Sequence, residues 1–211
     1  MYLSRVQLNT RKRSTKLALA SPNRIHGAVE NCFTDREERK LWRADRLGGD
    51  EYLLILSPEK PCLSGLKEQF GFPGTPDEIR SYDEFLDRIE EGSVWQFRLA
   101  ANPVHAVKKE GEAKEDRGRV MAHATERYQL EWLEGRALKN GFSIDRGSTL
   151  VVSSEWKVFY RKGSTARVTL RETVFQGVLR VEDLPLFRNA LTCGIGRGKA
   201  YGMGLLTVMR G

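Results

Sequence analysis

One histidine with polar neighbours is the first candidate for chemistry in this sequence. His26 follows Asn23 and Arg24, and Glu30 comes four residues later. A histidine side chain can accept or donate a proton near neutral pH, which suits general acid–base catalysis. Taken by itself, the pattern favours a histidine on a helix surface without a catalytic task.

A glycine-rich stretch near the end of the chain is the second candidate. Arg197, Lys199 and Tyr201 lie between two glycine–apolar–glycine triplets, 194–196 and 202–204. The whole stretch has five glycines: Gly194, Gly196, Gly198, Gly202 and Gly204. Glycine allows close backbone approach and positive φ, and arginine and lysine suit phosphate. The backbone of this stretch is therefore expected to lie close to a polyanion or to the helix of His26. The alternative is a tight turn before a buried strand.

Two known phosphate-binding motifs are excluded by the spacing of this stretch. A Walker loop needs glycine where Cys193 stands and serine or threonine where Ala200 stands. The dinucleotide fingerprint needs a glycine at Tyr201 and a strand–helix unit after the loop, for which too few residues remain.

A basic segment between residues 156 and 171 is the third candidate. Arg161, Lys162 and Arg167 cluster at the tip of an expected hairpin, and Arg171 shares a strand face with Arg167. The segment is either a solvated basic edge that deters sheet pairing or a hairpin that grips RNA phosphates. The major groove of A-form RNA is narrow, so such a hairpin would bind near the end of a stem.

Composition points to an anionic partner. The 211 residues carry a net charge of +7, which is typical of proteins that bind nucleic acid. No stretch approaches the roughly 20 apolar residues of a membrane span. Because residues 1–6 already resemble a strand, we expect no signal peptide and a cytoplasmic protein with no membrane partner.

The cysteines and histidines do not have metal-site spacing. Cys32, Cys62 and Cys193 are far apart, and we expect three buried reduced thiols. His105 and His123 are equally scattered and are only reserve candidates for proton transfer. We therefore expect neither a metal nor a small-molecule cofactor.

The elements that must position these residues form two similar series. The expected strands cover 2–9, 39–47, 51–57, 95–107, 148–154, 155–162, 166–181 and 205–208; the expected helices cover 21–33, 63–69, 84–91, 124–139 and 183–192. A basic loop is expected at 10–16, and a charged, mobile loop is expected at 108–119. Ser21 and a capping box from Ser81 to Glu84 are expected to cap their helices. The order predicts an α+β protein with two tandem ferredoxin-like (RRM-like) βαββαβ domains, 1–92 and 93–211, joined by a short linker.

The chain resembles a known family over nearly its whole length. The matching segments, in chain order, are Met1–Val6, His26, Phe97–Pro103, Arg119-Val120 with Glu131–Leu133, Phe175–Leu179 and Gly194–Gly204. In these it resembles the CRISPR-associated endoribonucleases of the CasE type. The glycine-rich loop matches the family pattern at every glycine.

This resemblance implies tandem ferredoxin-like domains, His26 as the catalytic residue and a basic hairpin that grips a CRISPR repeat stem-loop. It implies metal-independent cleavage at the 3′ base of the stem, leaving a 2′,3′-cyclic phosphate and a 5′-hydroxyl. It also implies that the product is kept and that other Cascade subunits are partners. The RNA-binding candidates are Arg161, Lys162, Arg167, Arg171, Arg197 and Lys199.

One position departs from the family, which carries a tyrosine three residues before the histidine. That position is Asn23, and an amide can orient a phosphate but cannot transfer a proton as a phenol does. Arg24, Lys199 and Tyr201 are alternative supports for catalysis. The alternatives to an enzyme are a non-catalytic RNA-hairpin-binding subunit and an unrelated RNA-recognition scaffold that stacks bases on aromatic side chains. No strand is expected to carry the aromatic pair that such a scaffold uses.

Overall fold

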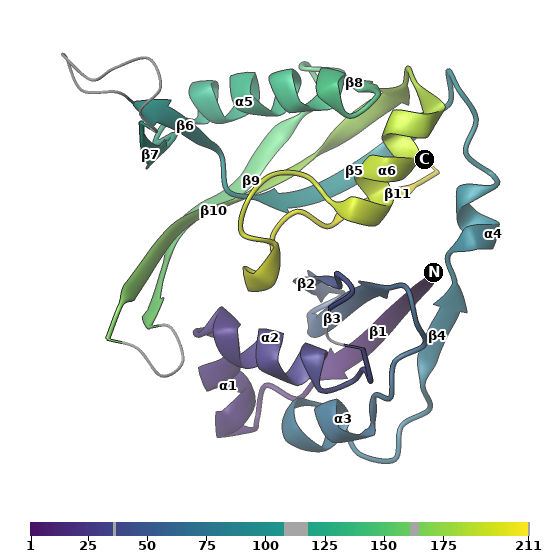
Figure 1. The fold of residues 1–211 in the computed structure, drawn as a ribbon, viewed down its shortest axis with the longest axis vertical. Helices are drawn as coiled ribbons and strands as arrows, with labels where there is room; N and C mark the ends of the chain where they lie inside the picture. The colour runs from purple at the N-terminus through teal and green to yellow at the C-terminus, as the bar shows by residue number, and fades with distance from the viewer. Residues whose placement is uncertain (36, 108–117, 161–164, 211) are drawn as a thin grey trace.

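The computed structural model describes residues 1–35, 37–107, 118–160 and 165–210, which build two packed antiparallel sheets and a separate two-stranded one (Figure 1). None of the helices in this part of the chain is long and apolar enough to cross a membrane. Arg161, Lys162 and most of the expected loop at 108–119 lie outside the described residues.

The first half of the chain forms a four-stranded sheet. Its elements are β1 (Tyr2–Leu8), α1 (Arg13–Leu19), α2 (Pro22–Glu30), β2 (Leu41–Leu47), β3 (Asp50–Ser57), α3 (Ser64–Phe70), β4 (Glu78–Ser81) and α4 (Asp83–Leu86). The strand order is β2-β3-β1-β4, which is the ferredoxin-like order of a βαββαβ unit.

The second half repeats this plan with longer strands. Its elements are β5 (Val94–Ala101), β6 (Val104–Val107), β7 (Arg119–Ala122), α5 (Glu126–Lys139), β8 (Phe142–Ile144), β9 (Leu150–Tyr160), β10 (Arg167–Val181), α6 (Leu184–Cys193), η1 (Lys199–Tyr201) and β11 (Leu206–Met209). The sheet order is β11-β5-β10-β8, and β9 pairs with the same edge of β10 as β8. The second strand of the repeat is therefore split into β8 and β9.

Alternating side chains on the first sheet bury both of its faces. Leu53 and Ile55 point toward the helices and pack with Ile25 and Val29 of α2. Leu56 points the other way, into the core of the second half. Because burying a large aliphatic side chain stabilises a fold by about 1.5–3 kcal/mol, this shared core holds the two halves together.

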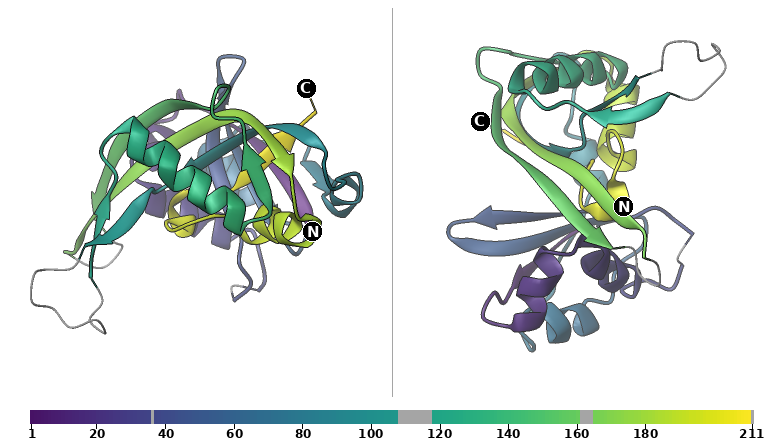
Figure 2. Two further views of the ribbon diagram at one scale, coloured as in Figure 1. Left: turned by 90° about the horizontal axis from the view of Figure 1, so that it is seen from above. Right: turned by 90° about the vertical axis from the view of Figure 1, so that its left-hand side faces the viewer.

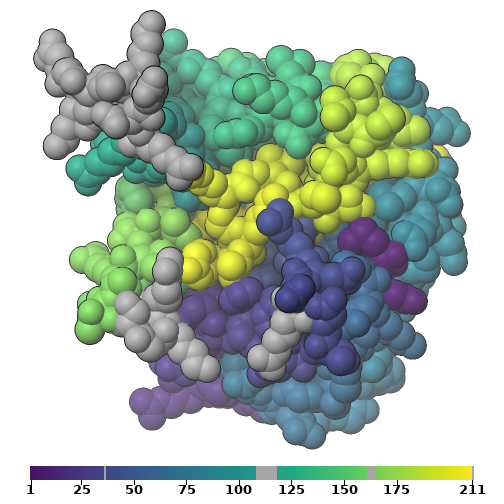
Figure 3. Space-filling model, viewed as in Figure 1, coloured from purple at the N-terminus to yellow at the C-terminus, as the bar shows by residue number. Residues whose placement is uncertain are grey.

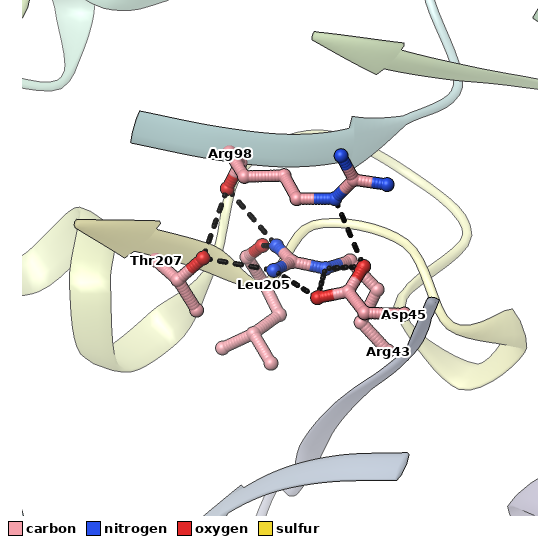
Figure 4. Close-up of polar contacts among 5 residues, drawn as sticks. All are labelled: Arg43, Asp45, Arg98, Leu205 and Thr207. Atoms are coloured by element: carbon pink, nitrogen blue, oxygen red, sulfur yellow. Dashed lines mark hydrogen bonds and ion pairs between the residues drawn. The ribbon is translucent and has the colours of Figure 1, made fainter. Parts of the chain in front are cut away.

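A buried charge network also crosses between the halves (Figure 4). Arg43 of β2 donates to the carboxylate of Asp45 and to the backbone oxygens of Arg98 and Leu205, at 2.9 and 2.7 Å. Arg43 also donates to Thr207, and Arg98 donates to Asp45. The side chains of Arg43 and Asp45 are each 3% exposed, so both charges are neutralised inside the interface.

The predicted fold class is confirmed, with several corrections to its elements. The basic stretch expected as a loop at 10–16 enters α1, because Thr15 and Ala18 share a face that is buried. β4, β7 and β8 were not expected, since strands of three or four residues are too short to show a periodic pattern. The two strands expected between 148 and 162 are the single strand β9. The division at residue 92 stays a prediction.

Capping and thiol burial also differ from expectation. Ser81 belongs to β4, so no capping box forms and α4 is a single turn from Asp83 to Leu86. Ser21 precedes α2 as expected, but its hydroxyl donates to the side chain of Asn23 instead of capping the helix. Only Cys32 is buried, whereas Cys62 and Cys193 are exposed.

Candidate active site between the two halves

Helix α2 presents His26 at the edge of its buried face. Ile25 and Val29 anchor the helix in the core, and the adjacent His26 side chain remains 38% exposed. One turn later, Glu30 places its Oε1 3.7 Å from His26 Nδ1. A carboxylate at this position can orient the imidazole ring.

Glu30 is held from its other side by a buried lysine. Lys40 Nζ lies 3.5 Å from Glu30 Oε2 and donates to the backbone oxygen of Asp35. The Lys40 side chain is fully buried and lies over the ring of Phe33, 5.2 Å from its centroid. Glu30 therefore lies between His26, at the surface, and Lys40, in the interior of the first half.

The glycine-rich loop lies between the halves because its backbone packs where side chains would clash. All five of its glycines have positive φ. A Cβ on Gly202 would lie 2.6 Å from the ring of Trp42, and one on Gly194 would lie 2.9 Å from the Gly204 oxygen. Figure 1 shows the loop and η1 reaching from the second half to α2. Of the alternatives left open by the sequence, the loop approaches the helix of His26.

One cavity combines residues of both halves. It has a volume of about 460 Å³ and is lined by His26, Glu30 and the segment 37–40 of the first half and by residues 196–200 of the loop. In Figure 3 the yellow loop lies directly against the purple and blue segments of the first half. We call this space the His26 cavity.

Positive charge gathers in the His26 cavity without full neutralisation. Arg39 and Lys40 contribute from the first half, and Arg197 and Lys199 contribute from the loop. Burial, together with the nearby Arg39 guanidinium, lowers the pKa of Lys199. Glu30, Glu37 and Glu38 supply the opposing charge. Such a site can bind a phosphate group and exchange protons with it.

Other predicted site residues lie outside the His26 cavity. Tyr201 packs on Phe159, with ring centroids 4.8 Å apart, and lines a neighbouring cavity. Arg24 is exposed on α2, and Arg167 is exposed on β10. Arg171 is half-buried and donates to Ser154.

Both polar atoms of the Asn23 side-chain amide form hydrogen bonds. Its Nδ2 donates to the backbone oxygen of Tyr160 at 3.0 Å, and its Oδ1 accepts from the Ser21 hydroxyl at 2.8 Å. Asn23 therefore ties the start of α2 to the end of β9. Figure 2 shows β9 and β10 running out of the second half toward the helices of the first.

Sequence reasoning missed the segment before β2. Glu37, Glu38 and Arg39 belong to a dense charged run that was in part assigned to a strand, yet they line the His26 cavity. The reserve histidines lie elsewhere: His105 is in β6, His123 directly follows β7, and their rings are 4.4 Å apart. Burial and the nearby His105 lower the pKa of His123.

Comparison with known proteins agrees with this arrangement. A family described as CRISPR associated protein matches residues 1–210. The CRISPR-associated endoribonuclease Cse3 of Thermus thermophilus is 28% identical over 224 residues, covering 99% of both chains. The Cascade subunit CasE of Escherichia coli is 26% identical over 57% of this chain and 60% of its own.

A solved structure of Cse3 bound to a 19-nucleotide RNA superposes with a TM-score of 0.80 at 25% identity, covering 99% of this chain and 100% of that one. The Thermus thermophilus Cse3 bound to an RNA representing a pre-cleavage complex gives 0.79 at 25% identity, with 99% and 98% covered. These matches confirm the resemblance that the sequence suggested. The chain belongs to the family of CRISPR-associated proteins that includes Cse3 and CasE.

Proposed function

We propose that the protein is an endoribonuclease that cuts precursor CRISPR RNA at the 3′ base of the repeat stem-loop. The observation that carries the proposal is the His26 cavity, where a histidine from one half faces cationic side chains from the other. The relative that matches over its full length is named a CRISPR-associated endoribonuclease, and its structures hold RNA.

The proposed reaction needs only protein side chains. The ribose 2′-oxygen loses its proton and bonds to the adjacent phosphorus, and the bond from phosphorus to the 5′-oxygen breaks. The departing oxygen takes up a proton, so the products are a 2′,3′-cyclic phosphate and a 5′-hydroxyl. His26 exchanges one of these protons, and the cationic groups stabilise the charge that develops on the phosphate.

The second catalytic role falls to Lys199 in this proposal. The Asn23 amide is hydrogen-bonded to Ser21 and Tyr160, so its role is to position α2. Lys199 lines the cavity with His26, and its lowered pKa makes proton donation easier than from an ordinary lysine. We further propose that the protein keeps its RNA product and assembles with other Cascade subunits in the cytoplasm.

A modified RNA tests this chemistry. The chain's own repeat hairpin, carrying 2′-deoxyribose only at the cut, should bind as tightly as the all-ribose RNA and resist cleavage. The all-ribose RNA should be cut equally well in the presence of a chelator. Prompt cutting of the deoxy substrate, or loss of activity in chelator, would contradict the mechanism. Tight binding of the all-ribose RNA without any cut would favour the non-catalytic RNA-binding subunit instead.

A further inference from the structure

The outer half of the β9–β10 hairpin, residues 156–160 with 167–171, has two unlike faces. We call it the arm. One face turns Phe159 inward, where it is 4% exposed. The opposite face leaves Trp156, Val158 and Tyr160 exposed by 52%, 42% and 62%. The two aromatic side chains are four residues apart on one strand face.

Cations accompany the aromatic side chains on this open face. The register pairs Trp156 with Arg171 and Tyr160 with Arg167. The Arg171 guanidinium lies over the Trp156 ring, 5.2 Å from its centroid.

The carboxylates next to the arm are on its other face. Glu155 and Glu172 form a register pair there and both contact Lys157. The open face of the described arm residues therefore carries aromatic, apolar and positively charged groups but no carboxylate.

We propose that this open face is a stacking surface for the unpaired nucleotides that adjoin the stem. Every base has a π-face that stacks on aromatic side chains, and arginine adds both stacking and phosphate neutralisation. Paired bases inside a duplex cannot present that face, so the surface selects single-stranded nucleotides. This inference rests on the proposed function, in which a hairpin RNA is cut beside His26.

The position of the arm brings such nucleotides to the reaction. The backbone oxygen of Tyr160 accepts a hydrogen bond from Asn23, and His26 follows Asn23 by three residues on α2. One helical turn advances only about 5.4 Å along the axis. The end of the arm therefore adjoins the turn of α2 that carries His26, and a nucleotide stacked on Tyr160 would lie near a phosphate held in the His26 cavity.

Two RNAs and two variants test the surface. One RNA is the repeat hairpin with a blunt stem end, and the other adds three unpaired adenosines at the 3′ base. Both carry 2′-deoxyribose at the last paired nucleotide of the 3′ strand, so neither can be cut there. The variant is W156A/Y160A, the conservative variant is W156F/Y160F, and the matched control is L150A, since Leu150 is 62% exposed near the other end of β9. Thermal unfolding of each variant checks its fold.

We expect the wild type, L150A and W156F/Y160F to bind the extended RNA about tenfold more tightly than the blunt RNA, and W156A/Y160A to lose this gain. An equal loss for both RNAs would show a duplex contact and overturn the inference. Unchanged affinity for both would also overturn it and leave the face to a protein partner. If the wild type bound neither RNA, the proposed function itself would fail, and the inference with it.

Discussion

Two charged clusters lie where the halves of the molecule meet, and they differ in how their charges are satisfied. In the first, Arg43 and Asp45 are 3% exposed and bond to each other and to the second half. In the second, Arg39 and Arg197 of the His26 cavity are exposed, and neither Arg197 nor Lys199 forms an ion pair with another described residue. The first cluster holds the halves together, and the second leaves charge available for a ligand.

Removing one partner of the closed cluster should have the largest effect on stability. Arg43→Met leaves the Asp45 carboxylate buried with only Arg98 to neutralise it. We expect the free energy of unfolding, measured in urea, to fall by about 3 to 5 kcal/mol. Arg46→Met on the same strand is the matched control, because Arg46 is exposed. A loss below about 1 kcal/mol would show that the network does not join the halves.

The contact between the loop and the first half should have the next largest effect. Gly202→Ala places a Cβ 2.6 Å from the Trp42 ring at a φ of +83°. Gly74→Ala has a similar φ of +79° with no atom within 4 Å, so it measures backbone strain alone. We expect Gly202→Ala to cost about 2 kcal/mol more in unfolding free energy than Gly74→Ala. Equal costs would mean that the loop is not held against Trp42.

A substitution in the open cluster should lower the cleavage rate without lowering the stability of the protein at neutral pH. Lys199→Met should slow single-turnover cleavage about 10- to 100-fold, because it removes a cation from the developing phosphate charge. Lys139→Met, an exposed lysine on α5, should leave the rate unchanged. A rate equal to wild type for Lys199→Met would remove Lys199 from the mechanism.

The pH dependence of the unfolding free energy of Lys199→Met also distinguishes the two clusters. The pKa of Lys199 is lower in the folded than in the unfolded chain, so the unfolded chain binds the extra proton between those two values. Unfolding free energy therefore rises with pH through that window, and Lys199→Met should remove this rise. At neutral pH the substitution should not destabilise the protein, in contrast to Arg43→Met.

The smallest expected effect is that of Glu30. Glu30→Gln keeps the shape of the side chain but removes the charge that faces His26 and Lys40. We expect about fivefold slower cleavage at unchanged RNA affinity, since one such interaction contributes about 1 kcal/mol. Glu68→Gln, an exposed glutamate on α3, is the control. Equal rates for the two variants would show that Glu30 does not position His26.

The sequence predicted the fold better than it predicted the site. Strong alternation in β5 and the apolar stripe of α2 are local patterns, so the class and order of elements followed from them. Short strands such as β4 exist because β1 offers an open edge, which no local pattern reveals. Arg39 and Lys40 reach the His26 cavity only because the loop of the second half closes over them, a tertiary contact invisible in the sequence.

Single-turnover cleavage by His26→Ala, with RNA affinity measured in parallel, tests the central claim most directly. The claim is that one imidazole from the first half acts on a phosphate held by the second. We predict a fall in the cleavage rate of at least about 100-fold at unchanged affinity, while His105→Ala behaves as wild type. Cleavage by His26→Ala within about tenfold of wild type would contradict the account.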